Sequence, residues 1–527
     1  MTLTRYNATA ATLSKNRTGS DWCPFSGMCV TCIDGCIGMC EVGKSAYRGH
    51  EVIYPQPFGI ITAASQKDYP VDLSHFNIMG TAVGAVGMEA DSDKAIFPNV
   101  DLETKLGSNG NGIKMRLPII IPGLGSTDVA RLNWEGLAIG SAISGTPLTI
   151  GENVCGMDVE SKIKNGKVTH SPELERRVKM YQQWQREGYG DIIIQANVED
   201  TRLAVQEYAL EKLGAETVEL KWGQGAKDIG GEVKIKNLEK AQLLKKRGYI
   251  VLPDPLDPAV VEDFKRGAFT EFERHSRVGM VTEEDFMKRV EELRKAGAKR
   301  IALKTGAYRP ADLARAVKFS SMAKIDYLTV DGAGGGTGMS PWRMMNEWGI
   351  PSIELWSLTH QYCDRLAKKG QYLPDIVFAG GIIMEDQIFK AIALGAPYVK
   401  AIGMARGPVA AAMVGKTIGK AIETGDLPVY LERFGRSREA IFVTAEKLKR
   451  EYGKDYNKLP TSAIALYTYY ERLSQGLRQL MAGNRKFGVK HIDRNDIASL
   501  TPEASKISGI PIITDLDKKE VDKILDA

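Results

Sequence analysis

Short apolar runs alternate with amphipathic segments between residues 111 and 425. Each run is only a few residues long, which suits a buried strand better than a helix. Most of the segments between the runs repeat apolar residues at helical spacing. These expected helices cover residues 173–186, 201–213, 283–296, 310–319 and 384–394. Eight runs are candidate strands: 119–121, 148–150, 191–195, 217–221, 300–304, 327–330, 376–379 and 399–402.

This alternation predicts the fold class. Repeated strand–helix units with eight candidate strands favour an α/β protein whose parallel sheet closes as a (β/α)8 TIM barrel over residues 111–425. A doubly wound open sheet is the alternative. Residues 223–282 are too long for a loop and predict an elaboration after the fourth strand. We expect an irregular, cysteine-containing N-terminal region over residues 1–110 and a helical C-terminal extension over residues 426–527.

Composition narrows the class of protein. Hydrophobic residues make up 43% of the chain and charged residues 26%, which argues against a disordered or membrane-spanning chain. The chain carries 70 basic and 65 acidic residues with the signs interspersed, so nothing indicates nucleic-acid binding. The N-terminus has no apolar stretch of signal-peptide length, and we therefore expect a cytoplasmic protein. A homo-oligomer is compatible with the sequence.

Glycines gather where three consecutive strands are expected to end. Residues 331–338 hold five glycines in eight positions. One such loop would be compatible with an ordinary tight turn, but three in consecutive positions favour a site for a phosphate or another anion. The candidate cofactor-binding residues in these loops are Asp331, Gly332, Gly335, Gly336, Thr337, Gly380, Gly381, Gly403, Met404, Ala405 and Arg406.

Polar side chains end several other strands. Lys221 and Lys304 each follow an apolar run, and a cation there could stabilise negative charge that develops on a cofactor or substrate. The alternative is an internal salt bridge, for instance with Glu152 or Asp331. Glu152 is itself a candidate acid/base catalyst. Gln195 ends the third strand and could hydrogen-bond to the edge of a heterocycle, and Ser126 follows the first strand as a further candidate cofactor contact.

Four segments resemble one enzyme family. They are PLTIGENV (147–154), VELKWGQGAKDIGGEV (218–233), ALKTGAYRPADLARAVKFSSMAKIDYLTVDGAGGGTGMSP (302–341) and FAGGIIMEDQIFKAIALGA (378–396). Together they are similar to the FMN-binding synthase domain of glutamate synthase, over roughly residues 115–425 and part of the helical tail. The resemblance implies a barrel that holds FMN, with the phosphate near the last three strand ends. It also implies that Lys304 faces the N1/O2 edge of the flavin, where its charge favours the anionic reduced form.

The chain also departs from this family. Complete glutamate synthases begin with a glutaminase domain whose nucleophile is an N-terminal cysteine, whereas the first cysteine here is Cys23. We therefore expect the protein to use free ammonia or to take it from a separate partner. The family's cysteine trio for a [3Fe–4S] cluster has no counterpart in residues 401–419. The resemblance alone thus leaves the substrate open.

Five of the seven cysteines lie in one short N-terminal segment. Cys29, Cys32, Cys36 and Cys40 could ligate an iron–sulfur cluster, and Cys23 is an alternative fourth ligand. In one continuous helix, Cys29 and Cys40 would lie about 16 Å apart, so the cluster requires a break in the chain's path. Zinc, which four thiolates also suit, remains an alternative, as do buried or redox-sensing thiols.

These features lead to one leading expectation for the function. We expect an FMN-dependent oxidoreductase in which electrons pass from ferredoxin or a redox partner subunit, through the iron–sulfur centre and FMN, to an imine or a related acceptor. The substrates that the resemblance implies are a 2-oxo acid (2-oxoglutarate) and ammonia, or an amino acid. The alternatives are an FMN-dependent dehydrogenase of another amino or hydroxy acid and a non-catalytic electron-transfer subunit.

Overall fold

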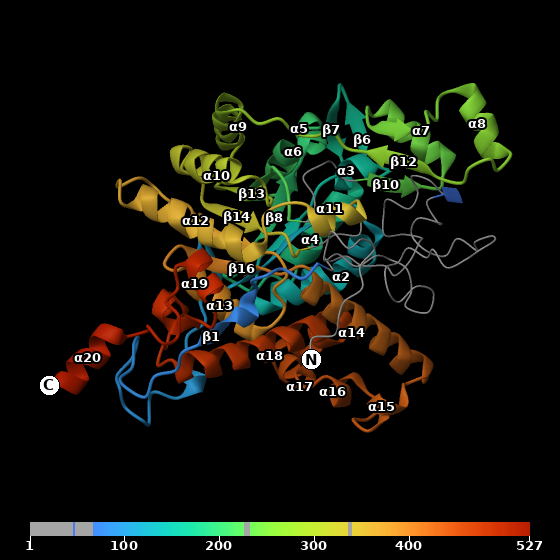
Figure 1. Ribbon diagram of the computed structural model, residues 1–527. Helices are drawn as coiled ribbons and strands as arrows, with labels where there is room; N and C mark the ends of the chain where they lie inside the picture. Colours follow the sequence, from blue (N-terminus) through green and yellow to red (C-terminus); the bar gives the residue numbers. More distant parts are fainter. Residues whose placement is uncertain (1–45, 48–66, 226–231, 336–339) are drawn as a thin grey trace, which may run out of the picture.

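Eight parallel strands close into a barrel in the computed structural model, which describes residues 46–47, 67–225, 232–335 and 340–527 (Figure 1). The last strand pairs with the first, with Ile402 opposite Ile119. The expected (β/α)8 barrel is therefore confirmed, and the open doubly wound sheet is wrong. In chain order the barrel strands are β4 (Ile119–Leu124), β5 (Leu148–Ile150), β8 (Ile192–Ala196), β9 (Thr217–Lys221), β13 (Arg300–Thr305), β14 (Tyr327–Asp331), β15 (Asp375–Ala379) and β16 (Val399–Gly403).

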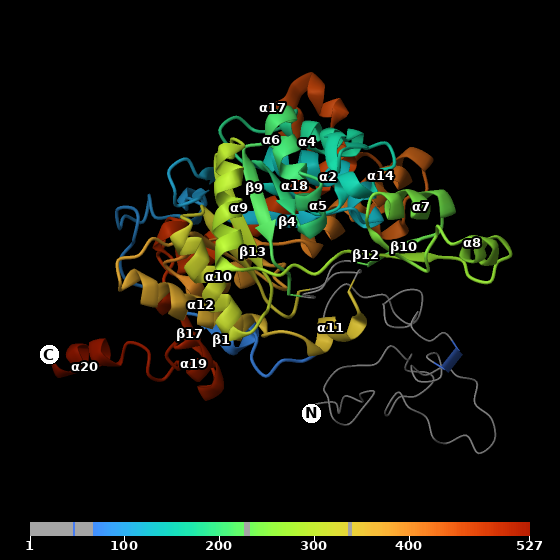
Figure 2. The same cartoon turned by 90° about the horizontal axis from the view of Figure 1, so that it is seen from above.

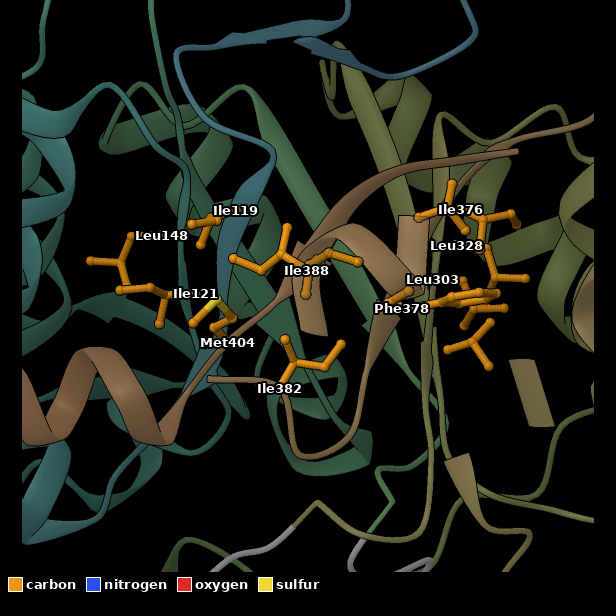
Figure 3. Packing of buried hydrophobic residues seen from close by; sticks show 14 of the residues in the cluster. Ile119, Ile121, Leu148, Leu303, Leu328, Ile376, Phe378, Ile382, Ile388 and Met404 are labelled. Atoms are coloured by element: carbon orange, nitrogen blue, oxygen red, sulfur yellow. The ribbon is translucent and has the colours of Figure 1, made fainter. Parts of the chain in front are cut away.

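The strands are buried on both faces, as strands of a parallel barrel must be. All six residues of β13 are buried. Alternate positions point inward or outward: Ala302 belongs to the cluster inside the barrel, and Leu303 belongs to the layer between the strands and the helices. Figure 3 shows part of that outer layer, in which Ile388 lies among strand residues such as Ile119 and Phe378.

Helices surround the barrel. The continuous helix expected over residues 201–213 is wrong, because the chain breaks at Ala204, whose φ of 54° is left-handed. The helices between and after the strands are α2 (Asp128–Ser144), α3 (Val154–Met157), α4 (Pro172–Gln182), α5 (Val198–Arg202), α6 (Val205–Lys212), α9 (Glu283–Lys295), α10 (Pro310–Met322), α11 (Trp342–Glu347), α12 (Ser352–Ala367), α13 (Glu385–Gly395) and α14 (Arg406–Thr424).

A hairpin closes the amino-terminal end of the barrel. Leu106 of β2 (Thr104–Leu106) and Met115 of β3 (Ile113–Met115) join the cluster of side chains inside the barrel. This end is therefore packed with apolar groups, and the opposite, carboxyl end of the strands is left for chemistry. Upstream of the hairpin lie η2 (Leu73–His75), β1 (Phe76–Ile78) and η3 (Phe97–Asn99).

The segment after β9 folds as a separate lobe, which projects from one side of the barrel in both views (Figures 1 and 2). Its three strands form an antiparallel sheet in the order β10–β12–β11. A second small hairpin, β6 (Lys162–Lys164) and β7 (Lys167–His170), follows α3. The elements of the lobe are β10 (Glu232–Ile235), α7 (Leu238–Lys246), β11 (Ile250–Leu252), α8 (Pro258–Lys265) and β12 (Phe272–His275).

The C-terminal extension is mainly helical, as expected. Its long helix α18 (Thr461–Gly483) packs closely on α2 and α14. A Cβ on Gly136 of α2 would lie 2.5 Å from the Cβ of Ser462, so only glycine allows this approach. Within the described residues, no helix combines the length and apolar composition needed to cross a bilayer. The remaining elements are α15 (Val429–Glu432), α16 (Arg438–Ile441), α17 (Ala445–Tyr452), η4 (Gly453–Lys458), η5 (Val489–His491), η6 (Arg494–Asp496), β17 (Ile497–Ser499, paired with β1), α19 (Pro502–Ser508) and α20 (Lys518–Asp526).

Candidate functional site at the mouth of the barrel

The glycine-rich loops after β14, β15 and β16 converge at one side of the barrel mouth. The backbone N–H of Gly332 donates to the carbonyl of Ala379 at 2.9 Å, and the Arg406 guanidinium donates to the carbonyl of Gly334 at 3.4 Å. Gly336 and Thr337 lie outside the described residues. The structure brings together the other candidate residues of these loops, which are Asp331, Gly332, Gly335, Gly380, Gly381, Gly403, Met404, Ala405 and Arg406.

The turn that directly follows β15 requires glycine at positions 380 and 381. Gly380 and Gly381 have φ values of 129° and 104°, a region that side chains rarely adopt. A Cβ on Gly380 would also lie 2.8 Å from the carbonyl oxygen of Gly332. The Ser352 hydroxyl, at the start of α12, donates to the Gly380 carbonyl at 3.0 Å.

Two helix starts lie beside these loops. Helix α12 begins at Ser352 and runs for 16 residues, and α14 begins at Arg406 and runs for 19. Gly334, Ser352, Gly380 and Gly381 line a cavity of about 360 Å³. A helix start and a nearby guanidinium group suit a phosphate group.

A buried polar group lies inside the barrel below the mouth. Lys304 is 5% exposed, and its ammonium group lies 3.1 Å from the Asp331 carboxylate. Burial lowers the pKa of Lys304, but Asp331 and Glu219 raise it, and the net direction is upward. The amide nitrogen of Gln195 donates to Glu219 at 2.5 Å. The amide oxygen of Gln195 is buried and has no hydrogen-bond partner among the described residues, so it can accept from a ligand.

A second ion pair lies on the other side of the mouth. The Lys221 ammonium group donates to Glu152 at 2.6 Å and to the side-chain oxygen of Gln224 at 2.8 Å. These residues line a pocket of about 620 Å³, to which Trp222 and Phe286 contribute aromatic rings. The Ser126 N–H donates to the Glu152 carbonyl at 3.2 Å.

Both strand-end lysines thus form the internal salt bridges that were the alternative to a role in ligand binding. The pairs Lys221–Glu152 and Lys304–Asp331 lie on neighbouring strands, because Lys304 is in register with Lys221. Because Lys221 and Glu152 line the pocket of about 620 Å³, their pairing does not prevent contact with a ligand there.

Glu219 and Gln224 are site residues that the sequence alone did not single out. Glu219 is 2% exposed, and burial raises its pKa, although Lys304 lowers it. The signal was present in the strand, since residues 219 and 221 must point to the same face of β9. A Lys221 side chain that faces a ligand therefore places Glu219 on the same face of the strand.

The predicted cluster ligands Cys29, Cys32, Cys36 and Cys40 lie outside the described residues. Within the described part of the chain, no three or more His, Cys, Asp or Glu side chains are grouped to hold a metal ion. Cys155 and Cys363 are buried there, and burial raises the pKa of each thiol to about 12. These two cysteines are therefore packing residues rather than reactive thiolates.

Comparison with known families supports the motif-based resemblance. Residues 274–413 match a family model described as a conserved region in glutamate synthase. A glutamate synthase large subunit-like protein from Bacillus subtilis is 31% identical over 122 residues, which is 22% of this chain and 22% of that protein. The match therefore spans about a fifth of that relative's length. The resemblance to the glutamate synthase family is confirmed over this part of the barrel.

Several solved structures have a partly similar backbone. One is a doubly substituted flavocytochrome b2 with sulfite bound; its TM-score is 0.46, its sequence identity is 13%, and the match covers 85% of this chain and 81% of that one. A putative lactate oxidase from Pediococcus acidilactici has a TM-score of 0.41, 13% identity and coverage of 79% and 81%. A mandelate oxidase with (S)-4-hydroxymandelic acid has a TM-score of 0.43, 16% identity and coverage of 80% and 87%.

Proposed function

We propose that this protein is an FMN-dependent oxidoreductase that acts on the carbon–nitrogen bond of an amino or imino acid. One observation carries the proposal. The glycine loops with Arg406 lie at the same barrel mouth as the buried Lys304–Asp331 and Lys221–Glu152 pairs. A phosphate-binding region next to charged side chains could bind a flavin, orient it and tune its electronics.

The residues at the mouth fit FMN. The loops after β14, β15 and β16 would hold the phosphate, with Arg406 supplying a charge-assisted hydrogen bond. The unpartnered amide oxygen of Gln195 would accept from a ring N–H of the flavin. Lys304 would place positive charge at the edge of the ring where reduction adds negative charge.

FMN, when bound, supplies two-electron transfer with the substrate carbon. The chain's own residues would do the rest. Lys221 would hold an anionic or carbonyl oxygen of the substrate, and Gln224 would orient the ammonium group of Lys221. Glu152, which lies 2.6 Å from that ammonium group, would take up or return the proton at the substrate nitrogen.

The finer reaction follows from the family resemblance. We propose the reductive formation of glutamate from 2-oxoglutarate and ammonia, with electrons delivered by ferredoxin or a partner subunit. We further propose an iron–sulfur centre on Cys29, Cys32, Cys36 and Cys40, and this step rests on their spacing alone.

Anaerobic turnover tests the proposal. The full chain, supplied with FMN and a low-potential reductant, is incubated with 2-oxoglutarate and ammonia, and glutamate is measured. Glutamate that forms only with both substrates supports the synthase reaction. If amino or hydroxy acids instead reduce the bound flavin, and no glutamate forms, the dehydrogenase alternative holds. If the flavin-loaded protein supports neither reaction but exchanges electrons with ferredoxin, the electron-transfer alternative holds.

A further inference from the structure

The residue after Glu152 adopts an unusual backbone conformation. Asn153 has a φ of 67°, in the left-handed region that residues other than glycine seldom occupy, although asparagine does so more readily than most. Asn153 is 2% exposed. Its backbone N–H donates to the Asp200 carboxylate at 2.8 Å. The surrounding structure therefore holds this conformation in place.

The side chain of Asn153 is held by the lobe formed by β10–β12. Tyr249 directly precedes β11, and its hydroxyl donates to the side-chain oxygen of Asn153 at 3.2 Å. The Tyr249 hydroxyl also packs directly against Gly156 in the following turn, since a Cβ on Gly156 would lie 1.7 Å from its oxygen. Tyr249 itself is 3% exposed.

The same lobe holds the chain that follows Asn153. The Arg247 guanidinium donates to the carbonyls of Gly156, Asp158 and Ser161 at 2.8, 2.6 and 2.8 Å. Met157 of α3 is part of the lobe's own apolar cluster. Residues 156–161 are thus attached to the lobe through hydrogen bonds and through its core, whereas Val154 and Cys155 pack in the cluster around the barrel.

The chain before Asn153 is attached to the barrel instead. The Glu152 carbonyl accepts from the Ser126 N–H at 3.2 Å, and a Cβ on Gly125 would lie 2.3 Å from the same oxygen. Glu152 therefore lies directly before Asn153, which contacts both the barrel side, through Asp200, and the lobe, through Tyr249. The torsion angles of Asn153 set the path of the chain between the two.

We propose that Asn153, held by Asp200 and by Tyr249 of the β10–β12 lobe, is a positioning residue that directs the Glu152 carboxylate toward Lys221. The lobe itself does not line the pocket; the segments that flank it, residues 223–224 and 277–281, do. Its role in the site is to hold Asn153 and thereby the position of Glu152. This inference deepens the proposed function and rests on it for the role of Glu152.

Hydrogen–deuterium exchange on the full chain without substrate tests the positioning itself. Asn153→Ala should speed amide exchange in peptides covering residues 151–158 by about tenfold or more, because local opening becomes easier. Asn165→Ala is the matched control, since Asn165 also has a positive φ, of 51°, but lies exposed in the β6–β7 turn. It should leave the exchange of residues 151–158 unchanged. Unaltered exchange in Asn153→Ala overturns the proposal.

A double-mutant cycle tests whether Asn153 acts through Glu152. Asn153→Ala should lower kcat by about 10²-fold, with KM and FMN content close to those of the parent protein. In a Glu152→Gln background the same substitution should lower kcat no further. Additive losses would mean that Asn153 acts independently of Glu152, which overturns the proposal.

Tyr249→Phe provides a second test if Asn153→Ala does not fold. It removes one hydroxyl and keeps the ring in the lobe's core, and it should reproduce both effects at smaller amplitude. Failure of the two ideas can be told apart. Altered exchange at residues 151–158 in a protein without flavin activity contradicts the proposed function but supports the positioning role. Normal exchange in both variants of an active flavoenzyme contradicts the positioning role alone.

Discussion

The two sides of the barrel mouth are built in different ways. The β14–β16 side is built from backbone, namely glycine turns and the starts of α12 and α14, the second of which carries Arg406. The β5–β9 side uses side chains, with Glu152, Lys221 and Gln224 in direct contact. The backbone side suits a group of fixed shape and charge, such as a phosphate. The side-chain side depends on the chemistry of individual residues and is therefore where the reaction should be sensitive to substitution.

The largest effect should follow from Glu152→Gln. Loss of a general acid/base typically lowers turnover by about 10²–10⁴-fold, and here the amide cannot carry the proton. FMN content should not change, because Glu152 lies on the side-chain side of the mouth. Steady-state kinetics and the flavin absorbance of the purified variant check both points. Glu160→Gln, at an exposed position, serves as a control, and a Glu152 variant with parental kcat would contradict the assigned role.

The backbone side should respond to Gly380→Ala with weaker FMN binding. The new Cβ would meet the Gly332 carbonyl at 2.8 Å and would require a φ of 129°. A distortion worth about 1.4 kcal/mol raises the Kd tenfold, and we expect at least that. Gly166→Ala is the control for backbone strain alone, because Gly166 also has a positive φ but lies away from the loop, with no neighbour within 4 Å of the new Cβ. Equal FMN affinity in both variants would mean that the β15 loop does not hold the cofactor.

Lys304→Met should change the redox potential rather than the occupancy of the site. Without the ammonium group, Asp331 and the buried Glu219 face the reduced flavin with no adjacent positive charge from Lys304. The midpoint potential should fall by about 30 mV or more, since 30 mV corresponds to a tenfold change for two electrons. Spectroelectrochemical titration measures this shift. A potential within error of the parent protein would remove Lys304 from the flavin edge.

The smallest effect concerns stability and pH. Burial raises the pKa of Asp200 to about 7, with Glu152 adding to the shift, although the Asn153 N–H lowers it. The folded state then binds a proton more firmly than the unfolded state, so this group's contribution to stability is lost as the pH rises from about 4 to about 7. Asp200→Asn cannot titrate, and its carbonyl can still accept from Asn153.

Thermal unfolding of the parent protein and Asp200→Asn at pH 5 and pH 8 checks this prediction. The stability difference should shift in favour of the variant by about 1 kcal/mol or more, the equivalent of one pKa unit. A difference that is the same at both pH values would mean that Asp200 is ionised throughout this range. A shift in favour of the parent protein would reverse the assigned sign.

The regular parts of the fold could be predicted from the sequence because their signals are local. Each barrel strand is an apolar run between turn residues, and the glycine loops follow three of these runs directly. The break of the helix at Ala204 could not be predicted, since alanine usually favours a helix and tertiary packing decides its φ of 54°. The ion pair between Glu152 and Lys221 could not be predicted either. These residues lie 69 positions apart in the sequence, and only the closed barrel brings them together.

Binding of FMN is the most direct test of the view that both sides of the mouth form one site. The full chain, purified anaerobically, is stripped of flavin and titrated with FMN while the flavin absorbance and fluorescence are recorded. The account predicts saturation at one FMN per chain, with Arg406→Ala binding more weakly than the parent protein and Glu152→Gln binding as the parent protein does. A folded chain that takes up no FMN at saturating concentration would contradict the account.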